Sequence, residues 1–177
     1  MTLEGAGERE IYAGRVVTLR LRQLPGADGS LRLREVVEHA AGAAVVAIDP
    51  DGQVLLVRQH RPAVDARLLE LPAGLVDPGE TPIACARREL EEETGYTADH
   101  LEPLARFYSS PGFCTELLHV FLATGVRECR AEPEHEEDIE LVRLPLSSAI
   151  ARVLEGEISD AKTIVGLLAY RDRLRPG

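Results

Sequence analysis

The chain has 177 residues, of which 45% are hydrophobic and 28% are charged, so it can bury a core and is expected to form one domain with at most an accessory subdomain. Its formal net charge of −10 at pH 7 argues against a protein that coats DNA or RNA, because such a surface has to be basic. We therefore expect no nucleic-acid partner. A small anionic substrate stays compatible with this charge, since a bound cation or a cluster of arginines can reverse the sign locally.

The cysteine pattern and the short apolar segments indicate in which cellular compartment the protein is expected. Cys85, Cys114 and Cys129 are odd in number and lack CxxC spacing, which favours a reducing environment. The first ten residues lack the basic and apolar regions of a secretory signal, and the longest apolar stretch, 40–48, is too short to span a bilayer. A cytoplasmic protein without a membrane partner is expected.

The first third of the chain predicts an antiparallel hairpin. Residues 11–24 alternate apolar and polar through much of their length, as a half-buried strand does, and residues 31–39 alternate again. The segment "PGADGS" between them is dense in turn residues. We expect this N-terminal region, residues 1–40, to stand apart from the domain that follows at 41–177.

Strands continue into the second domain. Residues 43–48 and 53–59 flank the turn signal "DPDG", and residues 67–71 are a further short strand candidate. The next stretch, "PAGLVDPGE", is too rich in glycine and proline for regular structure. Later strands are expected at 102–110, 117–123 and 138–144.

Three helices complete the pattern. Thr81 followed by Pro82 predicts the start of a helix that ends at Gly95 in a left-handed cap. Residues 146–155 and an amphipathic segment through 161–174, capped by Ser159 or Asp160, are the other two. Strands that precede and alternate with helices predict a mixed β-sheet packed by helices, in an α/β (α+β) domain.

The helix at 82–94 carries a cluster of carboxylates. Glu89, Glu92 and Glu93 have i, i+3 and i+4 spacing, so they share one face, whereas Glu91 points elsewhere and is expected to be solvated. Such like charges cost a few tenths of a kcal/mol per pair, and Arg88 alone cannot neutralise three of them. A divalent cation such as Mg²⁺ or Mn²⁺ can, because it prefers oxygen ligands. On spacing alone, a solvated glutamate-rich face is the other interpretation.

The flanking residues favour the cation. Residues 74–96, "GLVDPGETPIACARRELEEETGY", fit the pattern G-x5-E-x7-R-E-U-x-E-E-x-G-U, with U apolar and Tyr96 a mild departure at the last position. This pattern is the Nudix box, and the chain resembles the Nudix hydrolase family, which implies a Nudix fold with a mixed sheet sandwiched by helices. The resemblance implies that Glu89, Glu92 and Glu93 bind metal with the Ala73 carbonyl, and that Arg88 and Glu80 hold them in place.

Other stretches resemble the ADP-ribose pyrophosphatase subfamily. Pro111, 16 positions after Gly95, lies in "YSSPGFCTE", and "ELPAG" at 70–74, "VRQHRP" at 57–62 and "REVVEH" at 34–39 extend the likeness over most of the chain. The implied reaction is Mg²⁺-dependent hydrolysis of ADP-ribose to AMP and ribose 5-phosphate. The implied partner is thus a small-molecule nucleoside diphosphate substrate.

The subfamily resemblance also implies substrate contacts. Arg61 is the candidate for a substrate phosphate, because a guanidinium fork matches phosphate geometry; a surface arginine is the other reading. An N-terminal hairpin that swaps between subunits of a homodimer would bring its residues to the adenine end of the site. The candidates that line the ADP-ribose site are Ser110, Gly112 and Glu116, with Arg34 and Glu35 from the hairpin.

The acidic segment "EPEHEEDIE" at 132–140 has two interpretations: a solvated loop, or, as the resemblance implies, a loop that closes over the metals and supplies a base or ligand. Under the second, Glu136 and Glu137 are the candidates, Glu137 also as a metal ligand, and Glu134 stays open.

Two alternatives to ADP-ribose hydrolysis remain. One is the same chemistry on another nucleoside diphosphate conjugate, such as FAD or a nucleotide sugar. The other is a Nudix module that binds nucleotide without cleaving it, which the intact set of box glutamates disfavours.

Overall fold

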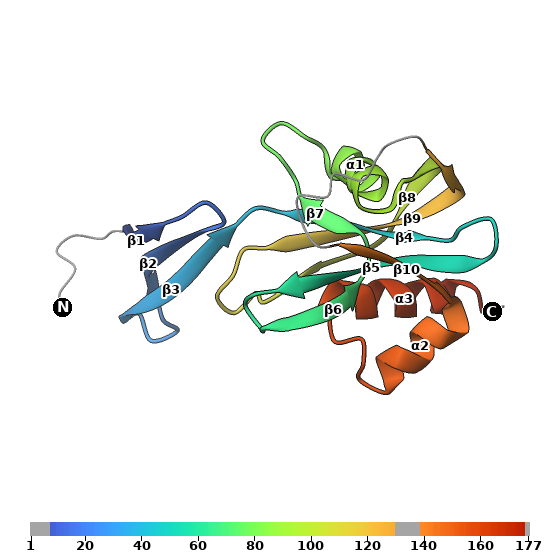
Figure 1. Cartoon of the computed structure of the whole chain (residues 1–177). Helices are drawn as coiled ribbons and strands as arrows, with labels where there is room; N and C mark the ends of the chain where they lie inside the picture. Colours follow the sequence, from blue (N-terminus) through green and yellow to red (C-terminus); the bar gives the residue numbers. More distant parts are fainter. Residues whose placement is uncertain (1–7, 130–138, 176–177) are drawn as a thin grey trace. The chain divides into compact units, whose positions relative to one another are not determined.

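The computed structural model describes residues 8–129 and 139–175 (Figure 1). Its contacts divide the chain into two units. The N-terminal unit consists of Met1–Ala41 and Tyr108–Leu117, and the main unit consists of Gly42–Phe107 and Leu118–Gly177. The N-terminal unit thus includes a segment from the middle of the chain, and the proposed swap between subunits stays a prediction.

The N-terminal unit contains an antiparallel sheet of three strands, in the order β1-β2-β3. The expected hairpin is β2 with β3, where Val17 pairs with His39 and Pro25 with Leu31. The stretch 11–24 is not one strand, because the chain turns after β1 and the Gly14 N–H donates to the Val17 carbonyl at 2.9 Å. The strands span β1 Glu8–Ala13, β2 Val17–Pro25 and β3 Leu31–His39.

The segment 109–116 pairs with the free edge of β3. The Val37 N–H donates to the Phe113 carbonyl at 2.7 Å, and the Val37 carbonyl accepts from the Thr115 N–H at 3.0 Å. The His39 N–H donates to Thr115 Oγ1 at 3.0 Å. These bonds attach the "SSPGFCTE" segment to the N-terminal sheet rather than leaving it as a free turn between two strands.

The main unit contains two sheets, in the orders β7-β4-β9-β8 and β10-β5-β6. Strands β4 and β9 pair in parallel, whereas β4 with β7 and β5 with both neighbours pair antiparallel, which confirms a mixed architecture. The strands span β4 Gly42–Ala47, β5 Gln53–Arg61, β6 Ala66–Glu70, β7 Ala73–Leu75, β8 Tyr96–Tyr108, β9 Leu117–Glu128 and β10 Glu140–Pro145.

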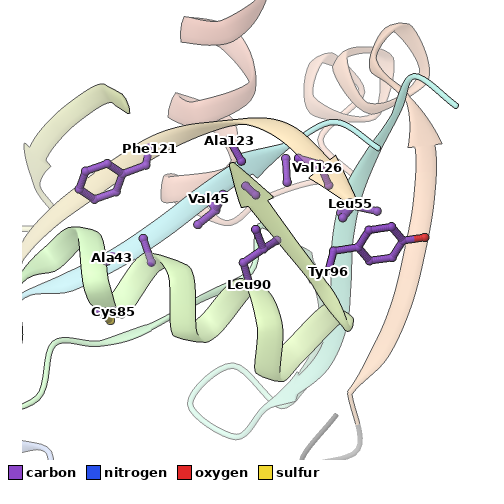
Figure 2. Close-up of a cluster of buried hydrophobic side chains, with 12 residues drawn as sticks. Ala43, Val45, Leu55, Cys85, Leu90, Tyr96, Phe121, Ala123 and Val126 are labelled. Atoms are coloured by element: carbon purple, nitrogen blue, oxygen red, sulfur yellow. The ribbon is translucent and has the colours of Figure 1, made fainter. Parts of the chain in front are cut away.

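Helices cover both faces of the main unit. Helix α1 (Pro82–Thr94) lies on one side of the sheets, and α2 (Leu146–Leu154) and α3 (Ala161–Arg173) lie on the other (Figure 1). Alternate residues of β4 face the two layers, as the period of a strand dictates. Val45 packs with Leu90 of α1, in the cluster that Figure 2 shows, and Val46 belongs to the cluster that contains Leu167 of α3.

The helix ends follow the local sequence signals. Thr81 Oγ1 accepts from the Ala84 N–H at 3.3 Å, and Gly95 has a left-handed φ of 71°, so both ends of α1 are where the sequence predicts. Asp160, rather than Ser159, caps α3, because its Oδ2 accepts from the Thr163 N–H at 3.0 Å. Within 8–129 and 139–175, no helix is both long and apolar enough to cross a membrane.

Three strand boundaries differ from the expectation. Strand β7 forms inside the glycine-rich stretch because Gly74 pairs with Ala43 of β4. Strand β8 begins at Tyr96 rather than at 102, and β9 continues to Glu128 rather than ending at 123. The Tyr96 ring is buried and its hydroxyl donates to Glu128 at 3.3 Å, which links the two added segments.

Candidate functional site

The carboxylate face of α1 lies against strand β7. Ala86 and Leu90, which neighbour Glu89 and Glu93 on the same side of the helix, anchor it in the core, and both are fully buried. This orientation turns Glu89 toward Gly74, where a Cβ atom would lie 1.9 Å from Glu89 Oε1. A glycine is required at this position for space, because any side chain would displace the carboxylate.

Arg88 connects this face to the loop before the helix. Its Nη1 donates to Glu89 Oε1 at 2.7 Å and to Glu92 Oε2 at 2.9 Å. Its Nε donates to Glu80 Oε1 at 3.1 Å, and its Nη2 donates to the Leu75 carbonyl at 3.3 Å. The hydrogen bond that Arg88 donates to Glu80 and the charges of the surrounding carboxylates raise the pKa of Arg88 further, so one permanent cation holds three carboxylates in a fixed arrangement.

Glu93 is a partly buried carboxylate of the face, with the largest pKa shift. Burial raises its pKa to about 8, although the hydrogen bond that its Oε2 accepts from the Ala73 N–H, at 2.9 Å, opposes the rise. The nearby Glu89 raises it further, and Lys162 and Arg61 lower it. Burial likewise raises the pKa of Glu89. Both groups therefore favour a neighbouring positive charge.

The donor set fits a hard divalent cation in chemical type. Three carboxylates on one helical face, with the Ala73 backbone next to Glu93, offer the oxygen ligands that Mg²⁺ and Mn²⁺ prefer. Burial raises the pKa of Glu89 and of Glu93, so a bound cation would offset the cost of their negative charge. In the described part of the chain no three His, Cys, Asp or Glu side chains are already arranged to hold a metal ion. Glu89 and Glu92 instead point to Arg88, so binding an ion requires their carboxylates to rotate.

Glu91 differs from the expectation of a solvated side chain. It is half-buried, and its Oε1 accepts from Thr97 Oγ1 at 2.6 Å. The reason is the early start of β8, which brings the chain back past the last turn of α1. Glu91 therefore lies off the carboxylate face, in a structural contact with β8.

Arg61 lies at the end of β5 and is paired within the protein. Its Nε and Nη2 donate to the two oxygens of Glu70, each at 2.7 Å. Glu70 also accepts from Lys162 Nζ, which lies 3.1 Å from Asp160 Oδ1. Burial alone would raise the pKa of Glu70, but Arg61 and Lys162 outweigh it and hold that pKa below its ordinary value.

The pairing of Glu70 and Lys162 was not anticipated from the sequence. Two signals pointed to it: Glu70 interrupts the apolar strand "RLLEL", and Lys162 is the only lysine among 20 Lys and Arg residues. A charged residue inside a buried strand requires a partner, but the sequence does not identify it at a separation of 92 residues.

The remaining substrate-site candidates lie in the N-terminal unit. Arg34 and Glu35 are exposed on β3, opposite Arg22 and Leu21 of β2. In the segment that pairs with β3, the Ser110 carbonyl accepts from the Phe113 and Cys114 N–H groups, at 3.1 and 2.8 Å. Gly112 is exposed, with open space around it. Glu116 has its Oε1 3.6 Å from His39 Nδ1, and its carbonyl accepts from the Ser109 N–H.

The structure thus divides the predicted site residues between its units. The main unit brings together Ala73, Arg88, Glu89, Glu92 and Glu93. Arg61 belongs to the same unit, and its positive charge lowers the pKa of Glu93. The loop candidates Glu134, Glu136 and Glu137 lie outside the described residues.

Comparison with known proteins identifies relatives over most of the chain. The profile of the NUDIX domain matches residues 38–165. The chain is 39% identical over 158 residues to the ADP-ribose pyrophosphatase of Bacillus subtilis (strain 168), an alignment that covers 88% of this chain and 85% of that protein. It is 40% identical over 149 residues to the GDP-mannose pyrophosphatase of Yersinia enterocolitica, with coverage of 78% and 77%.

A solved structure described as an ADP compounds hydrolase superposes with a TM-score of 0.84, over 95% of this chain and 91% of that one. At 23% sequence identity this likeness supports the fold alone.

Proposed function

This chain belongs to the NUDIX family, and on that premise we propose that it hydrolyses the pyrophosphate bond of ADP-ribose to give AMP and ribose 5-phosphate. The observation that carries the proposal is the carboxylate face of α1, where Arg88 holds Glu80, Glu89 and Glu92 together beside the partly buried Glu93. An arrangement that concentrates negative charge at a cost to the protein is suited to binding cations for a polyanionic substrate.

The proposed cofactor is Mg²⁺, with Mn²⁺ as the alternative, held by Glu89, Glu92, Glu93 and the Ala73 carbonyl. When bound, such an ion neutralises the pyrophosphate and lowers the pKa of a coordinated water. The residues of this chain have separate tasks. Arg88 keeps Glu89 and Glu92 on one side of the helix, and the Ala73 N–H orients Glu93.

A base is also needed to take a proton from the attacking water, at hydrogen-bond distance from it. We assign this task to Glu136 or Glu137, with Glu137 as a further metal ligand. The assignment is supported only by the carboxylates in that segment of the sequence and by the family's use of an acidic loop.

Substrate binding is assigned to two sets of residues. Arg61 would contact a substrate phosphate through the part of its guanidinium that Glu70 does not occupy, since its side chain is 38% exposed. Ser110, Gly112 and Glu116 would line the ADP-ribose site, with Arg34 and Glu35 toward the adenine.

A homodimer is proposed because the N-terminal sheet exposes large apolar side chains. Several large apolar side chains exposed in one small unit favour an interaction site. The exposed set is Ile11, Tyr12, Val16, Leu24, Leu31 and Leu33, each 41–61% exposed. The three cysteines are free, which supports the cytoplasm as the proposed compartment.

The second candidate is a GDP-mannose pyrophosphatase, which the relative of that name favours. ADP-ribose is preferred because the alignment with the ADP-ribose pyrophosphatase extends over 88% of this chain, against 78%. A substrate panel separates the two. The purified protein with Mg²⁺ is given ADP-ribose, GDP-mannose and FAD, and products are quantified by chromatography. The highest kcat/KM for ADP-ribose, with AMP and ribose 5-phosphate in equal amounts, supports the proposal, and higher values for either competitor overturn it.

A further inference from the structure

Glu70 is shared between two cations. It is 1% exposed and accepts from both Arg61 and Lys162. Arg61, Glu70 and Lys162 are here called the triad. Asp160 lies beside the triad, with its Oδ1 3.1 Å from Lys162 Nζ and its Oδ2 accepting from the Thr163 N–H at the start of α3, so the triad and Asp160 together carry no net charge.

The three side chains differ in how far they reach solvent. The Lys162 side chain is 10% exposed and that of Glu70 is 1% exposed, whereas the Arg61 side chain is 38% exposed. A ligand can therefore reach the guanidinium but not the ammonium. Of the two cations of the triad, Arg61 is the one that a ligand can contact.

The ammonium changes what the Arg61–Glu70 pair can do. Without Lys162, Arg61 faces the negative charges of both Glu70 and Asp160, and its guanidinium has little attraction for an anion. With Lys162 paired to both carboxylates, their charge is offset from the buried side, and Arg61 keeps more of its attraction for an anion while Glu70 still fixes its orientation through Nε and Nη2.

The triad lies beside the carboxylate face of α1. The positive charges of Arg61 and Lys162 both lower the pKa of Glu93. The segment after Glu70 also leads directly to this face, because the Leu71 N–H donates to Thr163 Oγ1 at 2.8 Å and the Ala73 N–H donates to Glu93. A phosphate held at Arg61 would thus be next to the proposed metal face.

The choice of lysine fits this position. Every other basic residue of the chain except the five histidines is arginine. A compact ammonium can share two oxygens in a confined space, whereas a guanidinium needs a planar fork and more partners. Lys162 therefore stands where an arginine would require additional buried acceptors.

We propose that Lys162 is a positioning residue that keeps Arg61 available to a substrate phosphate by neutralising Glu70 from the buried side. The proposal rests on the proposed function for the identity of the substrate, but not for the presence of a bound phosphate. It assigns a role in substrate affinity to a side chain that the substrate does not touch.

The test compares Lys162→Met with the double variant Glu70→Gln/Lys162→Met. In the single variant Arg61 is compensated by Glu70, so KM for ADP-ribose should rise about tenfold, which corresponds to roughly 1.4 kcal/mol, with kcat changed far less. In the double variant one cation and one carboxylate are both removed, so the net charge around Arg61 is that of the wild type and KM should return toward the wild-type value. Arg173→Met, which removes one charge from the last turn of α3, is the matched control and should leave KM unchanged.

A second measurement keeps the outcome independent of turnover. Binding of ADP is titrated calorimetrically in metal-free buffer, where Kd should follow the same order: weak for Lys162→Met, restored in the double variant, and unchanged in Arg173→Met. Wild-type protein that binds ADP with this pattern but does not hydrolyse ADP-ribose supports the triad and overturns the proposed function.

Three results overturn the role of Lys162. These are a double variant with weaker binding than the single variant, a loss confined to kcat and thermal stability, and wild-type protein that fails to bind ADP. The first two are what a purely structural lysine produces.

Discussion

Replacing Glu93 with glutamine tests the energetic cost of the carboxylate face. Burial raises the pKa of Glu93 to about 8 from an ordinary value of 4.5. The folded chain therefore binds this proton more tightly than the unfolded chain does, and the free energy of unfolding falls as pH rises from about 4.5 to about 8. Glutamine preserves the acceptor for the Ala73 N–H and removes this dependence.

The size of the effect follows from the pKa. Moving it from 4.5 to about 8 corresponds to roughly 5 kcal/mol, at about 1.4 kcal/mol for each tenfold change in the proton equilibrium. Relaxation of the side chain and entry of water reduce this, so we expect Glu93→Gln to be about 2 kcal/mol more stable than wild type above pH 8 in metal-free buffer. For a chain of this length that corresponds to a rise in Tm of about 4–8 °C.

The assay is urea unfolding in the presence of a chelator, at about pH 5.5 and about pH 9, for the wild type and for Glu93→Gln. The two proteins should be of similar stability at the lower pH and should diverge at the higher. Saturating Mg²⁺ should reverse the order at the higher pH, because an ion that binds the folded wild type stabilises it. Glu92→Gln is the control, since the Glu92 side chain is 41% exposed. A stability difference that does not change with pH, or a wild type that is the more stable protein at pH 9 without metal, refutes the reasoning.

Three further substitutions have defined outcomes. Arg88→Lys should lower kcat about 100-fold with little change in Tm, because an ammonium cannot span Glu80, Glu89 and Glu92 together; steady-state kinetics with near-normal kcat would contradict this. Gly74→Ala should lower stability by about 1–3 kcal/mol and weaken the Mg²⁺ dependence of activity, because the added Cβ displaces the Glu89 carboxylate; an unchanged metal titration would argue against it. Thr163→Val should cost about 1–3 kcal/mol in urea unfolding, because it removes the buried acceptor of the Leu71 N–H; a neutral result would mean that water replaces the hydroxyl.

The helices could be predicted closely because their ends carry local signals. Thr81, Pro82 and Gly95 define α1 from within a few residues of sequence, and the same holds for the cap of α3. The strands that were missed depend on distant pairing. β7 forms only because Gly74 meets β4, and β8 begins at Tyr96 because its continuation pairs with β9.

The site shows the same division between local and distant contacts. The shared face of Glu89, Glu92 and Glu93 follows from helical periodicity, and so does the contact of Arg88 with Glu92. The partner of Arg61 could not be derived, because Glu70 and Lys162 meet across 92 residues of sequence. Residues 109–116 attach to β3 through a tertiary contact, in which Thr115 binds His39 across 76 residues of sequence. This contact likewise has no local signature in the sequence.

The most direct test of the account is the kcat for ADP-ribose hydrolysis with Mg²⁺ in Glu92→Gln and Glu93→Gln, compared with Glu91→Gln. All three substitutions remove one carboxylate from α1, but Glu91 contacts Thr97 and lies off the carboxylate face. The account predicts a fall in kcat of about 100-fold or more for the first two and less than about threefold for the third, with circular dichroism unchanged in each. Near-normal kcat in both Glu92→Gln and Glu93→Gln, or an equal loss in Glu91→Gln, would contradict the assignment of the chemistry to this face.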